Sequence, residues 1–85
     1  MFKIERTIMI KKIDDDGELV PDVESDFFVK FSKDGYPVFD YDFRAEVFAT
    51  REEAEKIVDQ LKPRYDNTKN HFIRYYFEIQ EVKAA

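Results

Sequence analysis

The run from Asp14 to Glu18 reads Asp-Asp-Asp-Gly-Glu, and carboxylates spaced this closely are the oxygen ligands that Ca²⁺ prefers. The calcium loop of an EF-hand tests the idea, because its glycine occupies the sixth position. With Gly17 in that position, the first and twelfth positions are Lys12 and Val23, and neither carries a carboxylate. The sequence therefore predicts a solvated acidic loop at this point and no metal site.

Candidate catalytic residues are also scarce. The chain has one histidine, His71, and no cysteine, and its serines, Ser25 and Ser32, lie in no nucleophile motif. Asp40 and Asp42 share one face of an expected strand about 7 Å apart, a separation that glycosidase-type acid chemistry tolerates. A domain of this size is not expected to form a deep pocket around them, and two glycines are too few for a phosphate-binding loop. We therefore predict a protein that is not an enzyme and binds no cofactor.

Length and composition describe the body that carries these residues. The 85 residues are expected to form one domain, residues 1–85, which buries about 60–65% of its unfolded surface. Aromatic residues make up 16% of the chain, which argues against disorder, and without cysteine the fold depends on packing alone. No apolar run approaches the roughly 20 residues of a membrane span, and the first residues do not resemble a secretory signal. We expect a cytoplasmic protein.

Alternation of apolar and polar residues predicts the first strands. Residues 2–13 alternate as a strand does, whereas residues 14–26 are rich in acids without apolar periodicity and predict a long loop. A second strand is expected from Phe27 to Phe31, followed by a tight turn at Asp34-Gly35. Alternation resumes near Tyr36 and predicts a third strand that continues through Phe43.

The second half of the chain predicts one helix and a last strand. Thr50 and Glu53 have the spacing of a capping box, in which each side chain accepts from the backbone N–H of the other residue. Pro63 is expected to end this helix, and residues 66–70 form a polar connection to a strand over residues 71–82. The predicted fold class is α+β, a four-stranded, mainly antiparallel sheet with one helix on one face, in the order β-β-β-α-β.

A single amphipathic helix leaves the other face of this sheet uncovered. If Ile73 and its alternate neighbours face the helix, the intervening residues of the last strand face outward and form an aromatic and basic surface. Aromatic residues and arginine dominate protein interfaces, and they also stack the bases of single-stranded nucleic acid. The pI of about 4.8 opposes direct binding of nucleic acid, which favours a protein partner or a homodimer. The predicted sheet-face residues are Phe28, Lys30, Phe72, Arg74 and Tyr76.

The net charge of -5 is concentrated in one segment. Residues 1–12 sum to +3, residues 13–42 to -8 and residues 43–85 to zero. Side chains at alternate positions of an extended chain lie about 6.6–7 Å apart, close to the phosphate spacing of one nucleic-acid strand, so the acids can mimic a phosphate backbone. They equally serve solubility, and the sequence leaves both interpretations open. The acids predicted to contact a partner with a basic groove are Asp14, Asp15, Asp16, Glu18, Asp22, Glu24 and Asp26.

Residues 45–55, with the sequence Ala-Glu-Val-Phe-Ala-Thr-Arg-Glu-Glu-Ala-Glu, and the later residues 77–82 carry a family resemblance. Together they resemble a loose group of short, uncharacterised proteins from phages and bacterial mobile elements, which share an F-x-T-x-E-E-A helix start and a final strand. The resemblance covers about half of the chain and includes no catalytic residue. It implies a small acidic protein that binds and blocks a host protein, such as a CRISPR effector or another defence factor that holds nucleic acid.

Overall fold

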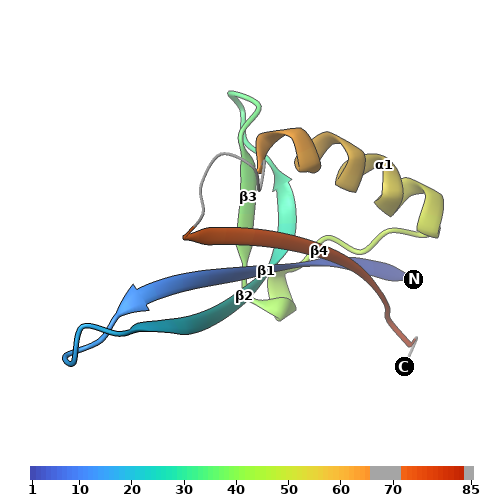
Figure 1. Cartoon of the computed structure of the whole chain (residues 1–85). Coiled ribbons are helices and arrows are strands. Elements are labelled where there is room, and N and C mark those ends of the chain that lie inside the picture. Colours follow the sequence, from blue (N-terminus) through green and yellow to red (C-terminus); the bar gives the residue numbers. More distant parts are fainter. Residues whose placement is uncertain (66–71, 84–85) are drawn as a thin grey trace.

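The chain folds into a four-stranded sheet with one α-helix across one face (Figure 1). The structure, a computed structural model of the whole chain, describes residues 1–65 and 72–83. The expected connection over residues 66–70 and His71 lie outside the described residues. The elements are β1 (Phe2–Ile13), β2 (Leu19–Phe31), β3 (Pro37–Asp40), the 3₁₀-helix η1 (Asp42–Arg44), α1 (Arg51–Leu61), the 3₁₀-helix η2 (Lys62–Arg64) and β4 (Ile73–Glu81).

The strand order is β3-β2-β1-β4, and every neighbouring pair is antiparallel. Strands β1, β2 and β3 form a meander, and α1 carries the chain across the sheet so that β4 pairs with β1. This arrangement confirms the predicted α+β class and the order β-β-β-α-β.

The core lies between α1 and the centre of the sheet. Its buried members come from β1, β2 and α1, and partly buried rings of Phe39 and Phe77 pack against them. Burying each of the larger members stabilises the fold by about 1.5–3 kcal/mol, which is why the short helix depends on the sheet. The buried residues are Ile4, Phe28, Ala54, Val58 and Leu61.

The capping box at the start of α1 is confirmed with one change. The Thr50 side chain accepts from the backbone N–H of Glu53 at 3.2 Å, as predicted. The Glu53 carboxylate accepts from the N–H of Ala49, also at 3.2 Å, and not from Thr50. The α-helix ends at Leu61, before Pro63, because proline lacks the N–H that a continuing helix needs.

The long loop predicted for residues 14–26 is wrong. Only residues 14–18 form the turn, and residues from Leu19 onward are the first part of β2. Their pairing with β1 is continuous, from Ile13 opposite Leu19 to Glu5 opposite Phe27. This part of β2 is an edge of the sheet, because β3 pairs with β2 only from Phe27 onward, so a proline and exposed acids are tolerated there.

The third strand is shorter than alternation predicts. It ends at Asp40, and the next residues form η1. The Asp40 carboxylate accepts from the N–H of Tyr41 at 2.7 Å and from the Arg44 guanidinium at 2.8 Å. These local hydrogen bonds compete with the sheet ladder and turn the chain away from it.

Candidate protein-binding surface

The hairpin of β1 and β2 extends well past the helix and the core. Strand β3 pairs only with the part of β2 from Phe27 onward, so from there to the turn the sheet consists of β1, β2 and the start of β4. We call this part, residues 7–25 with 72–76, the arm; it projects to the lower left in Figure 1. The Cα radius of gyration, 14.7 Å, exceeds the roughly 12 Å of a compact domain of this length, as a projecting arm requires.

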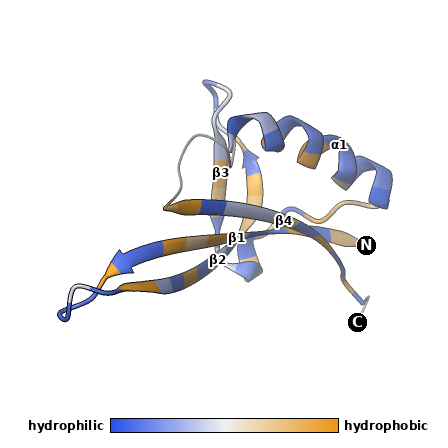
Figure 2. Ribbon diagram, in the orientation of Figure 1, coloured by the Kyte–Doolittle hydropathy of each residue, from blue (hydrophilic) through white to orange (hydrophobic). Residues whose placement is uncertain are grey.

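The face of the arm that lies away from α1 is apolar. Because cross-strand partners share a face, the register places Met9 beside Val23, Ile13 beside Leu19, and Thr7 beside Tyr76. Orange segments follow the arm in Figure 2. The large apolar residues on this face are between 38% exposed, at Met9, and 72% exposed, at Ile13, so their side chains meet solvent. We call this surface the arm patch, and it consists of Met9, Ile13, Leu19, Pro21, Val23, Phe72 and Tyr76.

Two cations lie within the arm patch. Lys11 stands between Pro21 and the register position of Phe72, and Arg74 lies opposite Met9. A hollow of about 200 Å³ opens among these residues. Aromatic rings, methionine and arginine, which are all present here, are enriched in protein interfaces.

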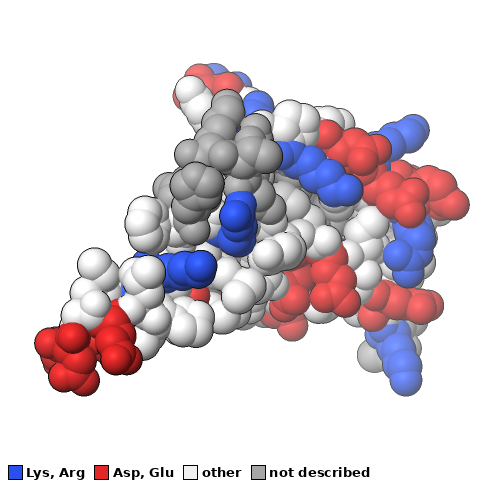
Figure 3. Space-filling model, viewed as in Figure 1, with Lys and Arg blue, Asp and Glu red and all other residues white. Residues whose placement is uncertain are grey.

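Four carboxylates occupy the turn at the free end of the arm, where Figure 3 shows a red cluster. Asp14 has a structural role, because its carboxylate accepts from the N–H of Asp16 at 3.0 Å and of Glu18 at 2.8 Å. Gly17 takes a φ of 81°, which its lack of a Cβ allows. The carboxylates of Asp15, Asp16 and Glu18 are exposed and are the ones that a partner can meet.

The other predicted acids lie on β2, on the opposite face of the sheet from the arm patch. Asp22 accepts from Lys12 at 2.7 Å, and this hydrogen bond raises the pKa of Lys12 above its ordinary value. Asp26 is held by Arg6 and is mostly buried. Glu24, the third acid on this strand, is exposed and forms no ion pair with another described residue.

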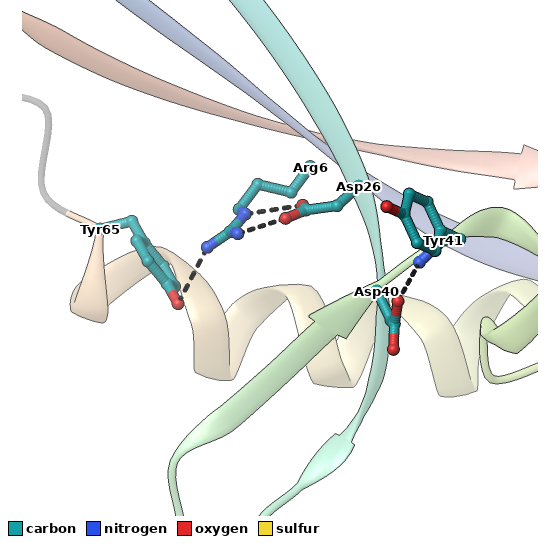
Figure 4. A network of polar contacts seen from close by, with 5 residues as sticks. All are labelled: Arg6, Asp26, Asp40, Tyr41 and Tyr65. Carbon is teal, nitrogen blue, oxygen red and sulfur yellow. Dashed lines mark hydrogen bonds and ion pairs between the residues drawn. The ribbon is translucent and has the colours of Figure 1, made fainter.

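Figure 4 shows why Asp26 is not a free surface acid. The Arg6 Nε donates to Asp26 Oδ1 at 2.8 Å, and a second nitrogen of the same guanidinium donates to Oδ2. The guanidinium also lies 3.7 Å from the centroid of the Phe39 ring and 3.4 Å from the Tyr65 hydroxyl. The Arg6–Asp26 pair packs against Phe39 and Tyr65 on the face of the sheet that carries α1. The Asp26 carboxylate therefore stabilises the fold and is not available to a partner.

The structure brings together three of the five predicted sheet-face residues. Phe72, Arg74 and Tyr76 lie on the open face as alternation predicts. The placement of Phe28 there is wrong, because Phe28 is 2% exposed and packs in the core. Lys30 is exposed but lies beyond the arm, past a bulge in β2 that restores Phe31 to the core side.

Sequence reasoning missed the β2 half of the arm patch. The loop predicted over residues 14–26 includes Leu19, Pro21 and Val23, although these residues alternate as one strand face does, with Asp22 between Pro21 and Val23. In the structure, these three residues pair with residues of β1, and the register of the two strands shows that they share a face with Met9 and Ile13. A hairpin centred on Asp-Gly at residues 16–17 is the signal that could have indicated this pairing.

A second exposed aromatic feature lies at η1. The rings of Tyr41 and Phe43 stack with centroids 5.8 Å apart, and they are 72% and 83% exposed. Ion pairs of Arg44 with Asp40 and of Lys3 with Asp42 surround them. The stack is separate from the arm patch.

Neither a metal cluster nor a membrane helix is present among residues 1–65 and 72–83. No group of three or more histidine, cysteine or carboxylate side chains is arranged to hold a metal ion there. No helix in this part of the chain is long and apolar enough to cross a membrane. Comparison of the chain with protein-family models, curated proteins and solved structures finds no match.

Proposed function

We propose that the chain is a non-enzymatic binding protein that acts through protein–protein contact at its arm. The observation that carries the proposal is the contiguous apolar surface of the arm patch, six of whose large side chains are 38–72% exposed. The largest apolar patch of a typical monomer covers about 300–600 Å² and is often functional. The arm patch lies on a projecting element, which allows it to enter a groove.

The chemistry of the free end indicates the kind of groove. Asp15, Asp16 and Glu18 bring exposed negative charge to the tip, and Glu24 extends it along the helix-side face. A groove lined by lysine and arginine, as in a protein that holds nucleic acid, complements this charge and speeds association. The arm patch would then contact apolar side chains at the wall of the groove.

Occupancy of such a groove would exclude nucleic acid, and this exclusion is the proposed mechanism. The resemblance of residues 45–55 to small phage proteins supports a bacterial host protein, including a defence protein, as the class of target. No residue of the chain needs to act as an acid, base or nucleophile in this mechanism.

Affinity capture from bacterial extract tests the proposal if nucleic acid is used as competitor. We expect the intact protein to retain a partner that a single-stranded oligonucleotide displaces. Val23→Asp, which puts a charge in the arm patch, should reduce retention at least tenfold. Gln60→Glu, which adds the same charge at an exposed position of α1, is the matched control and should retain the partner fully.

The tip is tested separately through salt. Asp15→Asn with Asp16→Asn should weaken retention at low ionic strength and have little effect at about 0.5 M salt, because exposed charges are screened there. Asp14 is left unchanged, since its carboxylate holds the turn. A partner retained equally by Val23→Asp, or the lack of any partner that nucleic acid displaces, would contradict the proposal.

A further inference from the structure

The outer edge of β4 presents backbone hydrogen-bonding groups to solvent. Lys11 N–H donates to the Phe72 carbonyl at 2.9 Å, and Val82 N–H donates to the Met1 carbonyl at 2.7 Å. The backbone N–H and C=O groups of successive residues in an antiparallel strand point alternately to one side and the other. The even-numbered residues of β4 therefore form their backbone hydrogen bonds with β1. The N–H and C=O groups of Phe77, Ile79 and Glu81 therefore point away from β1, where the described part of the chain places no strand.

The other edges of the sheet are protected against pairing. Asp14 N–H donates to the Glu18 carbonyl, so the even-numbered residues of β2 form their backbone hydrogen bonds with β1. The backbone N–H and C=O groups of the odd-numbered residues along the arm therefore point away from β1. Pro21 occupies one of these outward positions and has no N–H to offer. The outer strand β3 is four residues long and begins at Pro37. Strand β4 is longer, with nine residues and no proline, glycine or bulge, so its charged residues Arg74, Glu78 and Glu81 are its only edge protection among the described residues.

A groove of about 490 Å³ runs beside this edge, between β4 and α1. Val58 on the helix and Phe77 and Ile79 on the strand contribute its apolar side chains, and Glu78 of the strand also lines it. Arg51, Glu55, Asp59 and Lys62 of the helix side line its upper wall. A strand added beside β4 would place alternate side chains in this groove, which is the arrangement of β-augmentation.

We propose that the groove is occupied by β4 of a second copy of this chain, paired antiparallel with Ile79 opposite Ile79 of the second copy. In this register Phe77 and Glu81 of opposite copies exchange backbone hydrogen bonds, and the two Ile79 side chains meet beside Val58. On the open face, Tyr76 faces Val82 of the second copy, an aromatic and β-branched pair of the kind that stabilises sheets. The contact is isologous and closes as a dimer.

Complementary hydrogen bonding between Glu78 and Gln80 supports this occupant and this register. Glu78 lies opposite Glu5 of β1, a like-charge pair that destabilises an isolated sheet. Gln80 Nε2 already donates to Glu5 Oε1 at 3.1 Å and has a second N–H. Gln80 of the second copy faces Glu78 in the proposed register and donates to it. A register centred one residue earlier would place the two Glu78 carboxylates opposite each other.

Sedimentation equilibrium over about 1–500 µM tests the dimer. We expect reversible association of the intact chain from 10.2 kDa to twice that mass. Gln80→Glu puts two carboxylates opposite each other and should weaken association at least tenfold, whereas Gln80→Lys should strengthen it. Glu81→Pro removes an outward N–H without taking a hydrogen bond from β1 and should also weaken association. Thermal unfolding of each variant checks that it is folded.

A cysteine cross-link tests the register, because the chain has no cysteine of its own. Ile79→Cys should form a disulfide between copies on mild oxidation, since its two Cα atoms would be about 5.5 Å apart. Tyr76→Cys is the control and should remain reduced, because its two copies are far apart in this register. An intact chain that stays monomeric, or a dimer unaffected by Glu81→Pro, would overturn the inference. Cross-linking at Tyr76 and not at Ile79 would also overturn it and place the contact at the arm patch.

Discussion

Arg6 of β1 and Asp26 of β2 are opposite residues in the register, and their side chains form a two-pronged ion pair. Their side chains are 14% and 26% exposed, and the Phe39 ring covers the guanidinium. A charged pair enclosed in this way fixes the register of the hairpin where the arm leaves the core. It joins the part of the sheet that carries the helix to the part that carries the arm patch.

Loss of one member of this pair should destabilise the fold. We expect Asp26→Asn to lower the free energy of unfolding by about 2 kcal/mol, because the Arg6 guanidinium would lose its counterion in a mostly buried position. Urea denaturation followed by circular dichroism measures the change. Glu24→Gln, two residues away on the same face of β2, is exposed and should change stability by less than about 0.5 kcal/mol. Equal effects of both substitutions would show that the pair contributes no more than general surface charge.

The carboxylates at the tip should differ in their effects on stability. Asp14→Ala removes the acceptor of two backbone N–H groups and should cost about 1 kcal/mol. Asp15→Ala, at an exposed neighbouring position, should cost close to nothing. Amide hydrogen exchange at Glu18 provides a local readout, since its N–H should exchange faster in the Asp14 variant alone. Unchanged exchange in that variant would contradict the role assigned to Asp14.

Elements with strong local signals could be predicted from the sequence. The bounds of β1, residues 2–13, follow from its alternation, and the start of α1 follows from the Thr50 and Glu53 spacing. The helix cap was predicted because hydrogen bonds between residues three apart depend on local chemistry alone. The fold class followed from the order of these elements.

The missed features depend on contacts between distant residues. The first part of β2 contains acids and Pro21, and it is a strand because β1 pairs with it along its whole length. Phe28 and Lys30 are two residues apart, and in a regular strand they would lie on the same face. The bulge between them interrupts the alternation. The candidate site was therefore predicted on β4 and missed on β2, where the register and not the local sequence decides exposure.

The helix cap gives a local test of α1. Thr50→Ala removes the side-chain oxygen that accepts from Glu53 N–H and should cost about 1 kcal/mol of stability. Thr50→Ser keeps the acceptor and should cost much less. Thermal unfolding of the two variants compares them directly, and equal losses would indicate that the methyl group and not the hydrogen bond is responsible.

The ion pair of Lys12 and Asp22 should give a measurable pH dependence. The hydrogen bond to Asp22, and then its charge, raise the pKa of Lys12 above 10.5 in the folded chain. A raised folded pKa means that the contribution of the pair is fully present below the unfolded pKa and is lost as pH rises through the folded value. An NMR titration of the Lys12 side chain should show this upward shift, and Asp22→Asn should abolish it. A Lys12 pKa that is unchanged by Asp22→Asn would contradict the role assigned to this ion pair.

Truncation of two phenylalanines should destabilise the fold by very different amounts. Phe28 is 2% exposed and contacts the rings of Phe31, Phe39 and Phe48, whereas Phe43 is 83% exposed and stacks on Tyr41. Phe28→Ala should cost about 3–5 kcal/mol, because it removes a buried ring and leaves a cavity. Phe43→Ala should cost less than about 1 kcal/mol, since it removes one exposed stacking contact. Denaturation midpoints of the two variants measure this difference, and a large loss for Phe43→Ala would mean that the stack supports the turn at η1 as well as being exposed on it.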